Sequence, residues 1–251
     1  MKADNILQTY RSAALQLSLA DGCGCSAKDG DKETISIHAE AKGLYANLGC
    51  HTPVSFANLR NGEVVLDLGC GAGSDLCLAA KAVGEEGLAI GVDQLNEMVE
   101  LTRRNCAYSG LHNVDVRVGI IERLPLDDAS IDVVISNCVL NLSESKEVVC
   151  REIFRVLKPG GRIVIADSVK VRDLPSDLAD NDTLWSCCIA GALTQEEYES
   201  YLNRVGMTCV EFIAPVPDIP ALAEPELDGF ATSDLRGYVS SVIVRAIKPK
   251  N

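Results

Sequence analysis

Residues 65–75 read VLDLGCGAGSD, an apolar run followed by a loop with glycine at every second position. The run predicts a buried strand and Ser74 begins a helical pattern, so the glycines fall at a strand-to-helix turn. Glycine lets the backbone turn sharply and aim N–H groups at a ligand. The spacing differs from the G-x-G-x-x-G that binds a pyrophosphate, and the carboxylate of Asp67 stands beside it. The loop therefore favours a cationic or zwitterionic ligand.

Strand and helix patterns alternate along the chain on both sides of this loop. The predicted strands are 64–68, 88–92, 114–118, 131–136, 162–167, 207–213 and 238–247. The predicted helices are 5–20, 38–47, 74–83, 96–108, 144–157, 178–192 and 195–205, with Asn96 as a helix N-cap. This alternation is typical of an α/β protein with a doubly wound, mostly parallel sheet. We expect one seven-stranded Rossmann-like sheet with a helical N-terminal extension.

The organisation expected along the chain has three parts within that one sheet. Residues 1–60 form an N-terminal helical segment with a cysteine loop, and residues 61–170 form the cofactor-binding core. Residues 171–251 form a substrate-binding segment after the fifth strand and the last strands of the same sheet.

The composition narrows the classes of partner. The chain has 251 residues, with 36 acidic and 23 basic side chains and a formal net charge of −13. This charge repels phosphate backbones and anionic lipid surfaces, so we expect no nucleic-acid or membrane partner. No apolar run reaches the length of about 18 residues that a membrane span needs, and no signal-peptide core is present. We expect a cytoplasmic monomer.

Eleven cysteines are the least ordinary part of the composition. An odd number in a reducing compartment argues against a disulfide framework. We interpret five thiols in or beside apolar runs as packing residues: Cys70, Cys77, Cys106, Cys150 and Cys209. A zinc site is not expected, because no C-x-x-C pair exists and the three histidines lack ligand spacing.

One acidic residue follows the second predicted strand. Gly91-Val92-Asp93 ends that strand, which places a carboxylate at the carboxyl edge of the sheet. In doubly wound sheets this position holds the ribose hydroxyls of an adenosine cofactor. Asp93 is therefore predicted to bind a ribose.

Five segments, in this order, resemble the motifs of class I S-adenosylmethionine-dependent methyltransferases: 65–75, 90–93, 122–126, 132–137 and 157–161. The resemblance implies S-adenosyl-L-methionine as the cofactor. The cofactor-binding residues are then Asp67, Gly69, Gly71, Gly73, Asp93, Gln94, Ile121, Glu122 and Asn137. Within this set, Ile121 and Glu122 would flank the adenine, and Asn137 would close the sulfonium end.

Three further segments, 48–50, 135–143 and 188–193, resemble the arsenite methyltransferase family. The resemblance implies that Cys50, Cys138 and Cys188 bind trivalent arsenic and act as the catalytic thiols. Arsenite or methylarsenite would be the substrate, and a thiol of the glutathione or thioredoxin type the reductant.

Trivalent arsenic is soft and favours thiolates, which leave its lone pair exposed for attack on a methyl group. No general base is needed, because arsenic carries no proton, so positioning dominates. The function implied is arsenic detoxification.

Other interpretations remain open at this point. The chain could be a C- or O-methyltransferase acting on a small molecule such as a quinone precursor, since segments 122–126 and 157–161 occur in that family too. It could also be a non-catalytic arsenic-binding protein. Cys23 and Cys25 could deliver arsenic, complete a redox relay with Cys50, or simply lie in a mobile loop, and Cys187 could be a spare or packing thiol. The additional C-terminal domain of some arsenite methyltransferases is expected to be absent.

Overall fold

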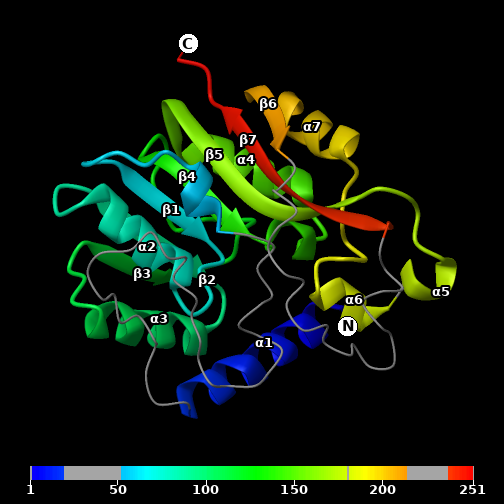
Figure 1. Cartoon of the computed structure of the whole chain (residues 1–251), viewed down its shortest axis with the longest axis horizontal. Coiled ribbons are helices and arrows are strands. Elements are labelled where there is room, and N and C mark those ends of the chain that lie inside the picture. The colour runs from blue at the N-terminus through cyan, green and yellow to red at the C-terminus, as the bar shows by residue number, and fades with distance from the viewer. Residues whose placement is uncertain (1, 20–51, 180, 214–236, 251) are drawn as a thin grey trace.

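A computed structural model describes residues 2–19, 52–179, 181–213 and 237–250, and the following statements concern these residues. They form a seven-stranded sheet in the order β3-β2-β1-β4-β5-β7-β6 (Figure 1). The strands are β1 (Val64–Leu68), β2 (Leu88–Asp93), β3 (Val114–Val118), β4 (Ile131–Asn137), β5 (Leu157–Lys170), β6 (Thr208–Ile213) and β7 (Val239–Ile247). The first five are parallel, whereas β7 runs antiparallel between β5 and β6. The predicted seven-stranded, mostly parallel sheet is confirmed.

Helices cover both faces of the sheet. They are α1 (Lys2–Leu19), α2 (Ser74–Val83), α3 (Asn96–Tyr108), α4 (Lys146–Val156), α5 (Ser176–Ala179), α6 (Asp182–Ser186) and α7 (Gln195–Arg204), with short 3-10 helices η1 (Pro53–Phe56) and η2 (Leu140–Leu142). Helices α2 and α3 pack with one set of strand side chains, and α4 and α7 pack with the other. No described helix is both long enough and apolar enough to cross a membrane.

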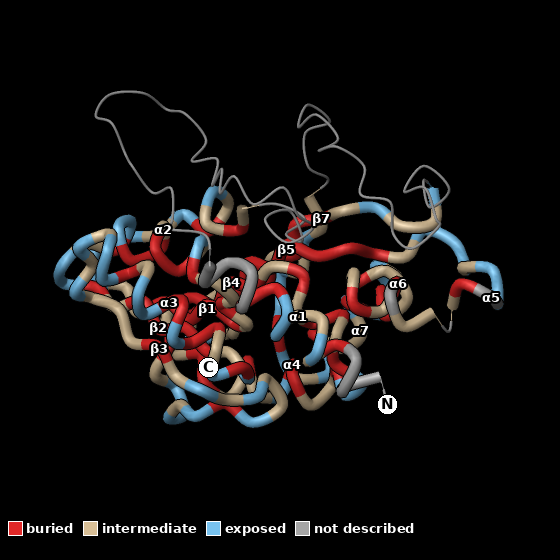
Figure 2. The backbone as a smooth tube through the Cα atoms, turned by 90° about the horizontal axis from the view of Figure 1, so that it is seen from below, coloured by how far each residue is buried: buried red, intermediate tan, exposed pale blue. Residues whose placement is uncertain are grey.

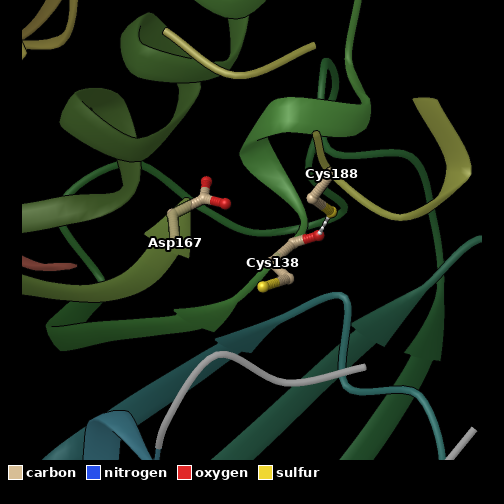
Figure 3. A group of neighbouring side chains, drawn as sticks. All are labelled: Cys138, Asp167 and Cys188. Carbon is tan, nitrogen blue, oxygen red and sulfur yellow. Dashed lines mark hydrogen bonds between the residues drawn. The ribbon is translucent and has the colours of Figure 1, made fainter. Parts of the chain in front are cut away.

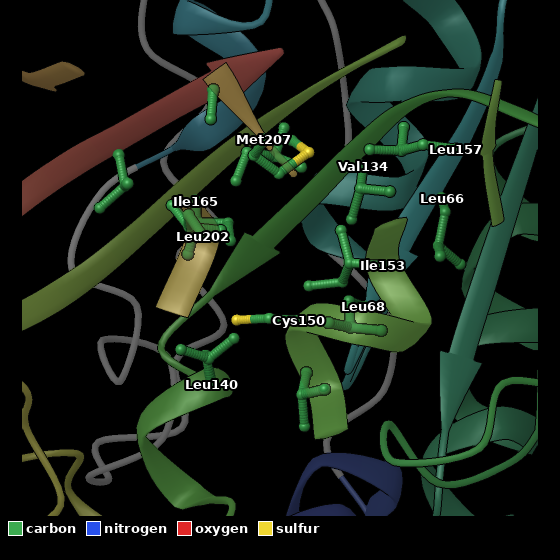
Figure 4. Close-up of a cluster of buried hydrophobic side chains, with 14 of the residues drawn as sticks. Leu66, Leu68, Val134, Leu140, Cys150, Ile153, Leu157, Ile165, Leu202 and Met207 are labelled. Atoms are coloured by element: carbon green, nitrogen blue, oxygen red, sulfur yellow. The ribbon is translucent and has the colours of Figure 1, made fainter. Parts of the chain in front are cut away.

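The alternation of side chains along β1 shows how the two cores are divided. Val65 packs against α2 and its neighbours, whereas Leu66 and Leu68 belong to the core under α4 and α7 (Figure 4). All three are fully buried. Figure 2 shows the buried residues concentrated along the strands and on the inner faces of the helices. Strands buried on both faces explain why the sequence reads as continuous apolar runs.

The order of the strands creates a switch point between β1 and β4. From β1 the chain builds outward through β2 to β3, and it then returns to place β4 and β5 on the other side of β1. Loops leaving β1 and β4 therefore diverge at the carboxyl edge of the sheet, where doubly wound folds bind their ligands. At this edge Ser136 donates its hydroxyl to the carbonyl of Leu68, at 3.0 Å.

Four details of the sequence interpretation were wrong. The predicted helix 178–192 is two short helices, α5 and α6, followed by turns, because Asn181 caps Leu184 with its side chain. The N-cap of α3 is Leu95, not Asn96, and no side chain caps it. The fifth strand is longer than predicted, since it pairs with β7 as far as Lys170. Cys209 is exposed rather than packed, because it lies on the edge strand β6 where the register shifts.

Other predictions fall outside the described residues or agree with the structure. The predicted helix 38–47, together with Cys23, Cys25 and Cys50, lies outside the described residues. The packing role is confirmed for Cys70, Cys77, Cys106 and Cys150, which are at most 7% exposed. The thiols of Cys77 and Cys106 lie 3.4 Å apart. Burial raises the pKa of Cys150 to about 12, which keeps this thiol protonated.

Arg162 at the start of the core part of β5 provides a test of the fold. Its guanidinium forms a bidentate ion pair with Glu63 and donates to the carbonyls of Ala57 and Asn58. We expect Arg162→Met to lower the free energy of unfolding by about 2–3 kcal/mol, because a half-buried carboxylate and two carbonyls lose their donors. Urea unfolding measures this. Arg151→Met, which removes an exposed ion pair with Glu147, should cost less than about 1 kcal/mol; equal losses would contradict the assignment.

Candidate active site

The glycine loop after β1 adopts the conformation that only glycine tolerates well. Gly69, Gly71 and Gly73 have φ angles of +73°, +51° and +90°. A Cβ atom at Gly69 would lie 2.5 Å from Val139, and one at Gly73 would lie 2.7 Å from Thr102, whereas Gly71 faces open space. The loop is also held from α3, because the Thr102 hydroxyl donates to the carbonyl of Gly71. The loop is therefore closely packed at Gly69 and Gly73, and of the three glycines only Gly71 has open space beside it.

Asp93 at the end of β2 faces this loop. One carboxylate oxygen accepts from the backbone N–H of Gly71 and the other from that of Leu95, both at 3.0 Å. Burial raises the pKa of Asp93, and these N–H groups oppose the rise. The predicted ribose ligand is therefore fixed in orientation at the carboxyl edge.

Two further carboxylates lie near Asp93. Asp67 is 3% exposed, and its Oδ2 has no hydrogen-bond partner among the described residues. Burial, and the negative charges of Asp75 and Asp93, raise the pKa of Asp67 well above its usual value. Burial also raises the pKa of Asp75 to about 6, although Asn137 donates to it at 3.0 Å. A buried acceptor without a donor, among like charges, suits a cationic ligand and opposes a phosphate.

Cys138 and Cys188 lie together at the same edge of the sheet. Cys138 follows β4 directly and Cys188 lies in the turn after α6, and they are 5% and 2% exposed. The Cys188 thiol donates to the backbone carbonyl of Cys138. Both residues have a positive φ, +57° and +61°. This left-handed conformation costs energy in a residue with a side chain, and such strain is concentrated at functional sites.

Asp167 completes this cluster. The Sγ atoms of Cys138 and Cys188 and one carboxylate oxygen of Asp167 lie within 4.8 Å of one another (Figure 3). Asp167 lies on β5, next to the Ala166 that pairs with Asn137, and is fully buried. Burial raises its pKa to about 7, while hydrogen bonds and the charge of Lys146 oppose the rise. Two soft thiols and a hard oxygen therefore share one buried site.

Asn141 in η2 joins the strand and the turn that carry this cluster. Its amide nitrogen donates to Asp167 Oδ1 and to the carbonyl of Ser168, both at 2.7 Å, and lies 3.4 Å from the carbonyl of Cys188. The ammonium of Lys146, itself buried, donates to the carbonyls of Ser143 and Asn141. Burial lowers the pKa of Lys146. These bonds fix the spacing of the two thiols.

Helix α1 packs against this edge of the sheet. The Tyr10 hydroxyl donates to the carbonyl of Ser186 at 3.3 Å, and Ala13 and Ala14 pack on Leu95 at the start of α3. Burial raises the pKa of Tyr10, and the nearby Cys188, Cys138 and Asp93 raise it further when they are ionised. Tyr10 is thus near both the thiols and the predicted ribose ligand.

The remaining residues predicted to bind the cofactor or arsenic differ in their burial and contacts. Glu122 is half-buried and accepts the hydroxyl of Ser143 at 2.6 Å, while Ile121 packs on the core under α4. Gln94 is exposed beside Asp93. Cys187 is half-buried and packs with Leu184. Cys50 lies outside the described residues, so the structure brings together two of the three predicted arsenic ligands.

Sequence reasoning missed three residues of the site: Asp167, Asn141 and Tyr10. A signal for Asp167 was available, because it stands near the carboxyl end of a parallel strand, as Asp93 does. Asn141 and Tyr10 carry no such signal. Their places depend on the packing of η2 and α1 over the sheet edge.

The sequence is similar to those of known methyltransferases. A sequence profile of a family described as "Methyltransferase domain" matches residues 59–206. The chain is 42% identical over 213 residues to the arsenite methyltransferase of Halobacterium salinarum, covering 85% of this chain and 54% of that one. It is 36% identical over 188 residues to the arsenite methyltransferase of Aquipseudomonas alcaligenes, covering 72% and 53%. The chain thus spans about half the length of these curated relatives.

A solved structure is also similar. It is that of an arsenic(III) S-adenosylmethionine methyltransferase from Chlamydomonas reinhardtii, at 33% identity and a TM-score of 0.61. The match covers 80% of this chain and 67% of that chain.

The raised pKa of Asp167 predicts how stability depends on pH. An exposed Asp has a pKa of about 3.9, whereas that of Asp167 is about 7. The unfolded chain therefore loses this proton at lower pH than the folded chain, and the free energy of unfolding falls as pH rises from about 4 to about 7. Below this window the contribution is fully present, and above it the contribution is lost.

We expect Asp167→Asn to make this fall shallower by up to about 1.4 kcal/mol for each pH unit. Urea unfolding at a series of pH values measures it. Asp173→Asn, at a position whose side chain is 93% exposed, is the control and should leave the slope unchanged. Parallel profiles for Asp167→Asn and the unmodified chain would show that Asp167 does not titrate in this window.

Proposed function

The chain belongs to the arsenite methyltransferase branch of the S-adenosylmethionine-dependent methyltransferases, and we propose that it transfers a methyl group from S-adenosylmethionine to trivalent arsenic held by cysteine thiolates. The observation that carries the proposal is the pair of buried, left-handed cysteines, Cys138 and Cys188, beside a glycine loop and Asp93 at one sheet edge. A methyl acceptor and a methyl donor require such adjacent sites.

The residues present fit the cofactor. The unpartnered oxygen of Asp67 and the charges of Asp75 and Asp93 suit a cation, and the open position at Gly71 leaves room beside the loop. When bound, S-adenosylmethionine supplies an electrophilic methyl group on a sulfonium cation. Asp93 would hold the ribose, and the loop of Gly69, Gly71 and Gly73 would lie against the methionine part. Gln94, Ile121 and Glu122 would line the adenine side, and Asn137 the sulfonium side.

The thiols hold and orient the arsenic. Each thiol replaces one hydroxyl of arsenite and releases one water, so arsenic remains trivalent and keeps its lone pair. Cys138 and Cys188 would be the first two ligands and Cys50 the third. Because arsenic carries no proton, the protein supplies position and a dry site rather than a general base. A thiol reductant of the glutathione or thioredoxin type would keep the cysteines reduced.

The alternatives explain less of the site. A C- or O-methyltransferase for a quinone precursor does not require two strained thiols beside a buried carboxylate, since it binds no soft atom. A non-catalytic arsenic-binding protein would not require the glycine loop and Asp93. We also propose that residues 171–251 complete the arsenic site and that the chain acts as a monomer.

The thiols give the first test. We expect Cys138→Ser and Cys188→Ser each to reduce arsenic methylation at least about 100-fold, because a hydroxyl is a poor ligand for a soft atom. Purified protein is incubated with arsenite, a thiol reductant and S-adenosylmethionine, and the arsenic species are separated. Cys209→Ser, at an exposed thiol on β6, should keep full activity. Methylation that survives loss of both site thiols would sink the proposal.

The cofactor site gives a second, independent test. We expect Asp93→Ala to weaken S-adenosylmethionine binding by about 1.5–3 kcal/mol, because charge-assisted hydrogen bonds to the ribose and to the glycine loop are lost. Calorimetric titration measures the affinity. Glu100→Ala, on the exposed side of α3, should bind as the unmodified chain does. An unchanged affinity in Asp93→Ala would exclude Asp93 as the ribose ligand.

A further inference from the structure

Asp167 has one carboxylate oxygen that is well bonded and one that is not. Oδ1 accepts from the Asn141 amide at 2.7 Å and from the backbone N–H of Ser168 at 2.9 Å. Among the described residues, Oδ2 has only the Tyr198 hydroxyl as a donor, at the long distance of 3.4 Å. A buried carboxylate oxygen normally has stronger partners. Asp167 therefore has spare acceptor capacity inside a fully buried site.

The chemistry of arsenic in this site calls for such an acceptor. Arsenite has three hydroxyls, and reaction with two thiols forms two As–S bonds and releases two waters. The arsenic keeps one hydroxyl, whose hydrogen needs an acceptor where water is excluded. One carboxylate oxygen of Asp167 lies within 4.8 Å of both sulfurs, so the carboxylate is near enough to receive this hydrogen bond.

We propose that Asp167 accepts a hydrogen bond from the hydroxyl that remains on arsenic when Cys138 and Cys188 bind it, so that the site recognises inorganic, hydroxyl-bearing arsenic. The inference rests on the proposed function for its substrate, but it concerns binding alone. Asp167 is then a specificity residue. A trivalent arsenical that carries one organic group loses both hydroxyls to the two thiols and gains nothing from Asp167.

The same bond orients the substrate. With two thiols and one anchored hydroxyl, all three substituents of a pyramidal arsenic are fixed, and the direction of its lone pair is fixed with them. Asn141 holds Asp167 in place from η2, and Ser168 holds it from β5. Capture by Cys50 would replace the anchored hydroxyl in a third exchange, with release of a third water.

The test compares two arsenicals on matched variants. The full chain carries Cys50→Ser, so that arsenite bound in the site keeps one hydroxyl. Arsenite and phenylarsine oxide, which as its dihydroxy form loses both hydroxyls to two thiols, are titrated at pH 8. Trp185 is the single tryptophan, and its carbonyl accepts from the N–H of Cys188, so its fluorescence reports on the site. Arsenic retained after gel filtration checks the stoichiometry.

Asp167→Asn is the informative variant. Its side-chain oxygen can keep the bonds from Asn141 and Ser168, while its amide nitrogen puts a donor where Oδ2 was. We expect arsenite affinity to fall about tenfold or more, with phenylarsine oxide affinity unchanged within about twofold. Asp173→Asn is the matched control and should change neither. Equal weakening of both arsenicals, or of neither, would overturn the inference.

A second variant keeps the inference testable if Asp167→Asn does not fold. Tyr198→Phe removes the long contact to Oδ2 and leaves that oxygen available, so arsenite affinity should hold or rise. A selective loss of arsenite affinity in this variant would contradict the proposal. If the chain with both site thiols binds neither arsenical, the proposed function fails and the inference with it. If it binds both but transfers no methyl group, only the proposed function fails.

Discussion

Five parallel strands end at one edge of the sheet. The register between them fixes the positions of the site residues that follow the strands. β1 pairs with β4 so that Leu68 lies opposite Ser136, and β4 pairs with β5 so that Asn137 lies opposite Ala166. The glycine loop begins one residue after Leu68, Cys138 follows Asn137, and Asp167 follows Ala166. Because the strands are buried on both faces, a one-residue shift in register would move each side chain into the opposite core, where it would not fit, so the packing of the two cores also fixes the geometry of the site.

The two cysteines store strain against this rigid edge. A non-glycine residue with positive φ is uncommon, and Cys138 and Cys188 are both of this kind and in contact through a thiol-to-carbonyl hydrogen bond. The bonds that Asn141 makes to Asp167, Ser168 and Cys188 oppose relaxation of the turn after α6. A pair of thiols held this way loses little conformational entropy when a ligand bridges them.

The sequence predicted those parts of the site whose positions follow from neighbouring strands and turns. The glycine loop and Asp93 could be read from the sequence because a strand, a turn and the carboxyl end of the next strand have fixed relations. Asp167 obeys the same relation but lay beside no glycine motif. Tyr10 lies 176 residues from Ser186, whose carbonyl it contacts, and no pattern within α1 indicates that packing. The error at Cys209 has a related cause, since alternation in a sequence does not reveal which strand will be at the edge.

The carboxylates at this edge also link ligand binding to stability. Asp67 is buried, Asp75 and Asp93 are half-buried beside it, and burial raises the pKa of each. Without a cation nearby, their ionised forms destabilise the fold, and the unpartnered oxygen of Asp67 adds to this cost. A cationic ligand relieves the repulsion and supplies the missing donor, so it stabilises the folded chain beyond its own contacts. This stabilisation by a cation depends on the three carboxylates at the sheet edge. It depends little on the net charge of −13, because the surface charges take no part in it.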